Sequence, residues 1–285
     1  MSSFNKKVSK EECNFCFLLA FFIAYVKMKI VYLIFISERR FTMNAFTVKW
    51  YTKFLTSLLG YTPELKVAMK LKNEGKWEEY KPLVDRKVRE WLVPLIDMAG
   101  VDFVVKGVEK VPANEPIIYT PNHAGMFDIP AVFLNAPIMP MFIAKKELSA
   151  FPFLKQWMWV LDCVFVDRKN KDGARSSLHQ AIDMVKNGRS LVIFPEGTRS
   201  KNGQLGKFKG GAMKIAMETG AKVVPVLIEG SRDRLEATGN VTPGTVYVTF
   251  LDPIETKGLT KDDFFKMPDE IRDMLQKERD NQKNS

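Results

Sequence analysis

Short β-type segments alternate with helical segments between residues 101 and 251, and this alternation constrains the fold more than any other feature of the chain. Strands are expected at residues 101–106, 116–120, 141–144, 163–167, 191–194, 223–228 and 245–251. Helical patterns lie between several of them, at residues 129–135, 174–186 and 211–219. Because strands that alternate with helices build a sheet covered on both faces, we expect an α/β fold with a mostly parallel sheet.

Helical patterns flank this alternating region on both sides. Apolar residues recur at three- and four-residue steps over residues 64–97, which Gly75 is expected to break and Pro94 to kink or end. We therefore divide the chain into four parts. They are a doubtful N-terminal extension (1–42), a helical membrane-associating region (43–100), an α/β domain (101–256) and a C-terminal helix (257–285).

An amphipathic helix is expected over residues 44–60, ended by Gly60. It combines aromatic residues such as Trp50 and Phe54 with Lys49 and Lys53. Aromatic rings and lysines are typical of a helix that lies in the lipid headgroup region. A helix that packs on the core of a soluble domain also needs one apolar face, so both interpretations stay open.

The first 42 residues allow three interpretations. Residues 15–36 are apolar and long enough to span a bilayer, but Lys27 and Lys29 would each cost roughly 2.5–3.5 kcal/mol near its centre. A secretory signal would need a small-residue cleavage site, which does not follow. Residues 38–42 can be encoded by a purine-rich ribosome-binding sequence placed just before Met43. We therefore hypothesise that the native chain begins at Met43.

The chain carries a formal net charge of +10 with a pI near 9.3. This excess predicts an anionic partner, either nucleic acid, anionic lipid or a phosphorylated substrate. Three cysteines cannot form a disulfide framework, which indicates a reducing, cytosol-facing environment. Cys13 and Cys16 have a metal-like spacing, but with two histidines and no second cysteine pair we expect no zinc site.

Two strands are each followed by a polar turn that holds candidate catalytic groups. The strand at 116–120 leads to His123 and Asp128, and the strand at 191–194 leads to Glu196 and Arg199. Since ligands bind outside the carboxyl ends of strands in an open parallel sheet, both turns should line one crevice.

His123 suits the role of a general base, because a neutral imidazole deprotonates a hydroxyl near pH 7. Asp128 could accept a hydrogen bond from its second ring nitrogen and stabilise the imidazolium. The alternatives are a buried, hydrogen-bonded histidine and an aspartate that caps the next helix. No G-x-S-x-G segment occurs and Cys163 lies in an apolar strand, so the nucleophile is expected to be a hydroxyl of the substrate.

Basic residues follow the strands at the same expected edge. Arg168 and Arg199 are candidates for holding a phosphate. Lys207 and Lys209 precede a helix whose N-terminal N–H groups favour an anion. For these four residues the alternative is an ordinary solvated surface.

Four ordered segments resemble the motifs of the glycerolipid acyltransferases typified by 1-acylglycerol-3-phosphate acyltransferase. They are Asn122-His123-x4-Asp128, Val164-Phe-Val-Asp-Arg168, Phe194-Pro-Glu-Gly-Thr-Arg199 and Val223-Val-Pro225-Val-Leu-Ile. The resemblance implies that His123 and Asp128 are catalytic. It also implies that Glu196, Gly197, Thr198 and Arg199, with Arg168, bind the glycerol-phosphate acceptor, and that Pro225 lies near the acyl donor.

The expected reaction is acyl transfer from a thioester to the free hydroxyl of lysophosphatidate, forming phosphatidate. The oxyanion would be held by the backbone N–H near Gly197 or by Lys145. Acyl-CoA or acyl-carrier protein would be the co-substrate, with no metal and no bound cofactor. Membrane lipids are the expected partners, nucleic acid is not, and the expected location is the cytoplasmic face of the membrane. The alternatives are another lysophospholipid or glycerol 3-phosphate as acceptor, and a non-enzymatic protein that binds anionic lipid.

Overall fold

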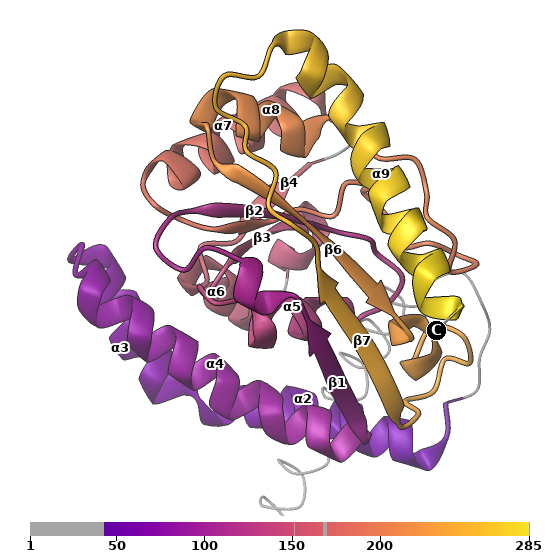
Figure 1. Ribbon diagram of the computed structural model, residues 1–285. Helices are drawn as coiled ribbons and strands as arrows, with labels where there is room; N and C mark the ends of the chain where they lie inside the picture. The colour runs from indigo at the N-terminus through magenta and orange to yellow at the C-terminus, as the bar shows by residue number, and fades with distance from the viewer. Residues whose placement is uncertain (1–42, 151, 168–169, 285) are drawn as a thin grey trace, which may run out of the picture.

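The computed structural model describes residues 43–150, 152–167 and 170–284, and these form one sheet covered by helices (Figure 1). The strands within these ranges are β1 (Val101–Lys106), β2 (Ile117–Pro121), β3 (Met141–Lys145), β4 (Val164–Val166), β5 (Leu191–Val192), β6 (Lys222–Glu229) and β7 (Gly244–Phe250). Their order across the sheet is β1-β7-β6-β2-β5-β3-β4. Every neighbouring pair is parallel except β6 and β7. The predicted α/β fold with a mostly parallel sheet is confirmed.

The single antiparallel pair follows from the short connection between its strands. Only the 3-10 turn Ser231–Arg234 and a loop lie between β6 and β7. A parallel crossover usually needs a helix of its own, so the chain returns antiparallel to β6 and then pairs in parallel with β1. This places residues 230–243 beside the carboxyl end of β6.

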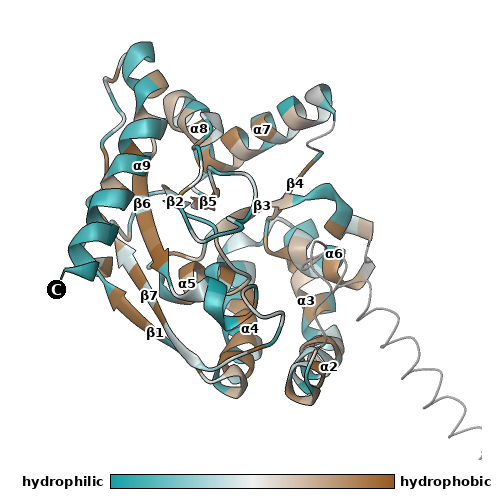
Figure 2. Cartoon of the chain, turned by 90° about the vertical axis from the view of Figure 1, so that its right-hand side faces the viewer, coloured by the Kyte–Doolittle hydropathy of each residue, from teal (hydrophilic) through white to brown (hydrophobic). Residues whose placement is uncertain are grey.

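Helices cover both faces of the sheet and enclose two buried clusters. On one face lie α2 (Ala45–Gly60), α3 (Thr62–Asn73), α4 (Trp77–Ala99), α5 (Asp128–Asn135) and α6 (Pro152–Val160). On the other lie α7 (Lys171–Lys186), α8 (Gly211–Thr219) and α9 (Lys261–Lys283). In Figure 2, α9 is mostly hydrophilic on the side that it shows, whereas Phe264, Met267, Ile271 and Leu275 are buried.

The structure settles one helix end that the sequence left open and adds one helix that the sequence did not predict. Pro94 lies inside α4 and does not end it; the helix runs on to Ala99 and ends at Gly100, whose φ of 66° is the left-handed conformation that glycine adopts readily. Helix α6 was not expected at all. Gly75 separates α3 from α4, as its position in the pattern predicted.

Helix α2 packs on the protein through its aromatic residues. Trp50 is 2% exposed, and its indole N–H donates to the carbonyl oxygen of Leu95 at 2.8 Å. The ring of Phe54 lies 4.9 Å from that of Trp91. The core-packing interpretation therefore holds for these two aromatic residues.

None of the helices in the described part of the chain is both long and apolar enough to cross a bilayer. The apolar segment at residues 15–36, the Cys13–Cys16 pair and the alternative start at Met43 concern residues outside the described ranges.

Candidate active site

His123 and Asp128 are paired in the turn between β2 and α5. Nδ1 of His123 lies 2.7 Å from Oδ2 of Asp128. The same oxygen accepts the backbone N–H groups of Ala124 at 2.7 Å and Gly125 at 2.8 Å. Asp128 is fully buried, whereas the His123 side chain is 17% exposed. The carboxylate is thus held by the turn itself and can orient an imidazole that still reaches solvent.

The alternative role of Asp128, as the cap of the next helix, is not observed. Asp128 is the first residue of α5, and the residue before it, Phe127, occupies the capping position without a side-chain bond. Its carboxylate points back to the turn, where it accepts N–H groups of residues that precede it. The interaction with His123 replaces the interaction with the helix N-terminus.

The turn that follows β5 lies directly against His123. The Phe194 ring stacks on the imidazole, with 4.0 Å between ring centroids and 22° between planes. The backbone N–H of Ser200 donates to the carbonyl oxygen of His123 at 2.7 Å. Gly197 closes its turn by donating to the Phe194 carbonyl at 3.0 Å, with a φ of 73°. The structure brings together the two turns that the sheet-edge argument placed in one crevice.

Glu196 is turned inward between these two turns. It is 6% exposed. One oxygen, Oε1, accepts the backbone N–H of His123 at 2.9 Å, and Oε2 accepts that of Gly206 at 3.1 Å. Burial raises the pKa of this carboxyl above its usual range, although both N–H groups act against the rise. Glu196 therefore holds the backbone of the histidine turn.

Asn122 fastens the same turn to β6. Its amide nitrogen donates to the carbonyl oxygen of Ile228 at 2.9 Å, and its amide oxygen accepts the Ile228 N–H at 2.7 Å. The residue is 2% exposed. The Asn122 amide thus makes the two hydrogen bonds to Ile228 that the backbone of a neighbouring strand would make. These bonds tie the backbone before His123 to β6.

The residues predicted to bind the acceptor phosphate differ in their surroundings. Nη1 of Arg199 is 2.7 Å from Oε1 of Glu236. A Cβ atom built on Gly197 would lie 2.8 Å from Nζ of Lys209, so the ammonium lies against this turn. Lys207 and Thr198 are exposed. Arg168 lies outside the described residues.

Two other predicted site residues, Lys145 and Pro225, lie on β3 and β6, and Cys163 was not expected to be a nucleophile. Lys145 is exposed at the carboxyl end of β3, which β5 separates from β2. Pro225 is buried within β6 and pairs in register with Thr120 of β2. Cys163 precedes β4, and burial raises the pKa of its thiol to about 12. A thiol with that pKa is a poor nucleophile near pH 7, consistent with an acceptor hydroxyl in that role.

Glu236 is the site residue that sequence reasoning missed. Besides the Arg199 guanidinium, its Oε1 accepts the backbone N–H of Met126 at 2.9 Å. Burial raises its pKa to about 7, against the lowering effect of Arg199. It lies in the loop between β6 and β7, which has no periodic pattern, so no local signal marks it.

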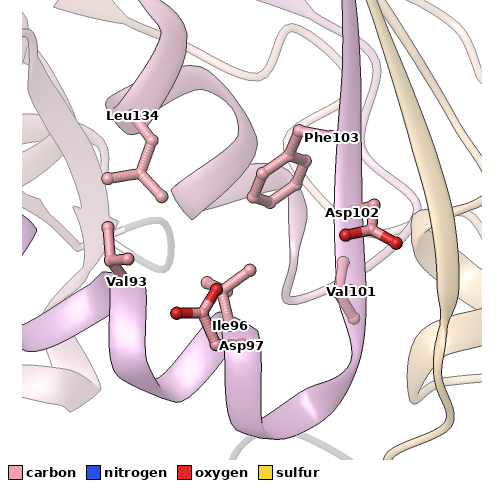
Figure 3. Close-up of a pocket in the computed structure, with 7 residues that line it drawn as sticks. All are labelled: Val93, Ile96, Asp97, Val101, Asp102, Phe103 and Leu134. Carbon is pink, nitrogen blue, oxygen red and sulfur yellow. The ribbon is translucent and has the colours of Figure 1, made fainter.

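Figure 3 shows a small cavity lined by residues of α4, β1 and α5. Its volume is about 260 Å³, and its lining residues are Val93, Ile96, Asp97, Val101, Asp102, Phe103 and Leu134. None of the predicted site residues lines it. In the described ranges, no group of three or more His, Cys, Asp or Glu side chains is placed to hold a metal ion.

Residues 102–229 match the family model described as Acyltransferase, and this range contains the paired His123 and Asp128 as well as Glu196. Over this range, which is less than half of the chain, the protein is similar to the acyltransferase family. The matched range therefore includes both turns, the one after β2 that carries His123 and the one after β5 that carries Glu196.

Two curated proteins illustrate the similarity of this chain to known acyltransferases. A 1-acyl-sn-glycerol-3-phosphate acyltransferase of Saccharomyces cerevisiae is 34% identical over 185 residues, covering 62% of this chain and 60% of that protein. One of Borreliella burgdorferi is 34% identical over 143 residues, covering 50% of this chain and 54% of that protein. The chain thus spans less than two thirds of the length of these relatives.

The fold is shared with a solved acyltransferase. The crystal structure of the 1-acyl-sn-glycerophosphate (LPA) acyltransferase from Thermotoga maritima matches with a TM-score of 0.65 and 25% sequence identity. The match covers 81% of this chain and 98% of the other. It extends over much more of the chain than the family model does.

Proposed function

We propose that this protein is a 1-acyl-sn-glycerol-3-phosphate acyltransferase, which forms phosphatidate from lysophosphatidate and an acyl thioester. The observation that carries the proposal is the His123 imidazole bound at Nδ1 by buried Asp128 and placed within the matched acyltransferase range. The names of the relatives and of the structural neighbour supply the acceptor.

In the proposed mechanism, Nε2 of His123 removes the proton from the free hydroxyl of the acceptor. The hydroxyl oxygen attacks the thioester carbonyl and forms the ester bond, while the carbon–sulfur bond breaks. The proton held on the imidazolium passes to the departing thiolate, so the products are phosphatidate and a free thiol. Asp128 stabilises the imidazolium between these two steps through the bond to Nδ1.

The acceptor phosphate is assigned to Arg199, which follows the Glu196-Gly197 turn, and to Lys209, whose ammonium lies against Gly197. A guanidinium binds phosphate oxygens through charge-assisted bonds. Thr198, Lys207 and Arg168 remain candidates for the same phosphate. The oxyanion is assigned to the backbone N–H near Gly197 or to Lys145. Acyl-CoA or acyl-carrier protein is the proposed donor, Pro225 is assigned to the donor side, and no metal or bound cofactor takes part.

A thioester-release assay tests the proposal. Purified protein is given acyl-CoA with lysophosphatidate, and in parallel with a lysophospholipid that carries a larger headgroup, with glycerol 3-phosphate, and with no acceptor. Release that requires lysophosphatidate and yields phosphatidate on thin-layer chromatography is expected. Release with another acceptor alone would replace the proposed substrate, and binding to anionic lipid without release would favour a lipid-binding protein.

We also propose that α2 and α3 rest on the cytoplasmic face of a membrane. Phe46 is 40% exposed and Val67 is 52% exposed, and Lys49, Lys53 and Lys66 are exposed on the same two helices. Exposed apolar side chains among lysines suit an anionic lipid surface, where each lysine contributes about 1 kcal/mol. An amphiphilic acceptor that partitions into the bilayer would then reach the site from the membrane.

Vesicle co-sedimentation tests this location. Phe46→Ser with Val67→Ser should weaken binding to vesicles that contain phosphatidylserine while leaving the melting temperature near that of wild type, because both side chains are exposed. Trp50→Ser serves as the contrast, because Trp50 is in the core and its loss should lower the melting temperature by several degrees. Unchanged vesicle binding of the double variant would remove α2 and α3 from the membrane contact.

A further inference from the structure

One carboxylate connects the turn that carries the histidine with the predicted phosphate-binding arginine. Oε1 of Glu236 accepts both the Met126 N–H at 2.9 Å and an Nη1–H of Arg199 at 2.7 Å. Met126 belongs to the turn between His123 and Asp128, and Arg199 ends the turn that follows β5. Glu236 itself comes from a third segment, the loop between β6 and β7.

The loop that carries Glu236 is fixed by its own backbone and by the core. Leu235, the residue before it, is fully buried. The N–H of Ala237 donates to the Arg232 carbonyl at 3.0 Å, and that of Gly239 donates to the Leu235 carbonyl at 2.7 Å. The backbone that carries Glu236 is therefore held by contacts that do not involve Arg199.

The histidine turn is shaped to receive this carboxylate. A Cβ atom built on Gly125 would lie 2.9 Å from Oε2 of Glu236 and 2.8 Å from the carbonyl oxygen of Ser231. Any side chain at position 125 would collide with the loop, so glycine permits the approach. The N–H of the same glycine donates to Asp128 on its other side, at 2.8 Å.

The two partners of Glu236 are both enclosed. The Arg199 side chain is 23% exposed and that of Glu236 is 14% exposed. A charge-assisted bond in such surroundings is stronger than one at the surface and restricts the guanidinium to a narrow range of positions. Restricting the guanidinium relative to the turn that holds His123 sets the spacing between a bound phosphate and the hydroxyl that is deprotonated.

We propose that Glu236 is a positioning residue that holds the Arg199 guanidinium at a fixed place relative to His123, and so aligns the acceptor phosphate with its reacting hydroxyl. The inference rests on the proposed function, because it assigns a phosphate to Arg199. Glu236 acts through Arg199 and does not touch the reacting atoms.

The carboxylate could instead weaken phosphate binding, since its charge attracts the same guanidinium. The two effects have opposite signs. If positioning dominates, removing the carboxylate raises the acceptor KM; if competition dominates, removal lowers it. The direction of the change in KM therefore decides between them.

The test measures KM for lysophosphatidate and for acyl-CoA separately, in wild type, Glu236→Ala and Glu236→Gln. Glu236→Ala should raise the acceptor KM about tenfold, the size expected for one lost charge-assisted bond, and leave the acyl-CoA KM within about twofold. Glu236→Gln should recover most of this loss, because one amide oxygen can accept both N–H groups that now reach Oε1. Asp233→Ala is the matched control, since this exposed carboxylate lies in the same loop and should change neither KM.

A double-mutant cycle shows whether Glu236 acts through Arg199. In an Arg199→Ala background, Glu236→Ala should add less than about twofold to the acceptor KM, because the partner that it positions is already absent. An effect of Glu236→Ala that persists there, that is equal for both substrates, or that lowers the acceptor KM overturns the inference.

The failure of the proposed function gives a different pattern. If wild-type protein releases no thiol with lysophosphatidate, the function fails before any variant is compared. If wild type is active and Glu236→Gln keeps the wild-type melting temperature, the KM comparison stands even where Glu236→Ala does not fold. A Glu236→Gln variant with an acceptor KM below that of wild type then overturns the inference alone.

Discussion

The Glu196 carboxylate supports the backbone of His123. Its Oε1 accepts the His123 N–H at 2.9 Å while its Oε2 accepts the Gly206 N–H, so neither oxygen is turned toward solvent. An acidic residue beside the proposed phosphate site would repel the ligand if its carboxylate faced it. Here it is used to hold the turn from which the imidazole projects.

Replacing Glu196 with Gln should therefore damage the turn more than acceptor binding. A glutamine has one acceptor oxygen, so its NH2 group must face one of the two buried N–H groups. We expect the free energy of unfolding to fall by roughly 1–3 kcal/mol, the cost of a buried unsatisfied donor, and kcat to fall with it. Chemical denaturation and initial rates check this. A selective rise in the acceptor KM at wild-type stability would instead favour direct contact with the acceptor.

His123→Ala should lower kcat at least about 100-fold, the lower end for lost general-base catalysis. The chain offers a control of the same type, because His179 is the only other histidine and is exposed on α7. His179→Ala should keep wild-type turnover. Equal activity in the two variants would exclude His123 as the base.

Asp128→Asn should also lower turnover, since an amide stabilises the imidazolium poorly. Because Oδ2 of Asp128 accepts two backbone N–H groups as well, the melting temperature should fall in the same variant. The double variant with His123→Ala should turn over no more slowly than His123→Ala alone, because the two residues act as a unit. Additive losses would indicate a separate role for the carboxylate.

Arg199→Ala should raise the acceptor KM about 10- to 100-fold and change the acyl-CoA KM much less, because a guanidinium contributes through charge-assisted bonds to phosphate. Arg199→Lys should restore little, since an ammonium lacks the planar fork of donors. Steady-state kinetics with each substrate varied in turn gives both values. An equal rise in both KM values would argue against a phosphate-binding role.

The pKa of Glu236 near 7 predicts a pH dependence of stability with a definite sign. In the unfolded chain this carboxyl ionises near 4.5, whereas in the folded protein it keeps its proton to about pH 7. Its stabilising contribution is complete below about pH 4.5 and is lost as pH rises through 7. The melting temperature of wild type minus that of Glu236→Gln should therefore decrease between pH 5 and pH 8. A constant difference would contradict the raised pKa.

The sequence predicted the meeting of the two turns because parallel strands present their carboxyl ends at one edge of a sheet. The pairing of His123 with Asp128 was accessible for the same reason, since both belong to one short turn. The inward orientation of Glu196 was not, because it depends on Gly206, which reaches it only when the following loop folds back. Glu236 was hidden further, because 110 residues separate it from Met126 in the chain.

The structure also placed two side chains whose surroundings the sequence left open. A helix with aromatic residues and lysines has one apolar face, which can contact either lipid or the protein core. The core position of Trp50 became clear from its burial and from the bond between its indole N–H and Leu95, a residue of a different helix. The capping role of Asp128 likewise depended on whether α5 began before or after it, and helix boundaries are the weakest part of such predictions.

The strand-like pairing of the Asn122 amide with Ile228 has a consequence for how the protein works at each turnover. A histidine turn fastened to a central strand is ordered once, when the chain folds, and need not be ordered again when lipid arrives. Binding of substrate then has little conformational entropy to overcome at this turn. Under the proposed function, a change of headgroup preference is expected from exposed side chains such as Thr198 and Lys207, whose replacement leaves the buried hydrogen bonds of the turn intact.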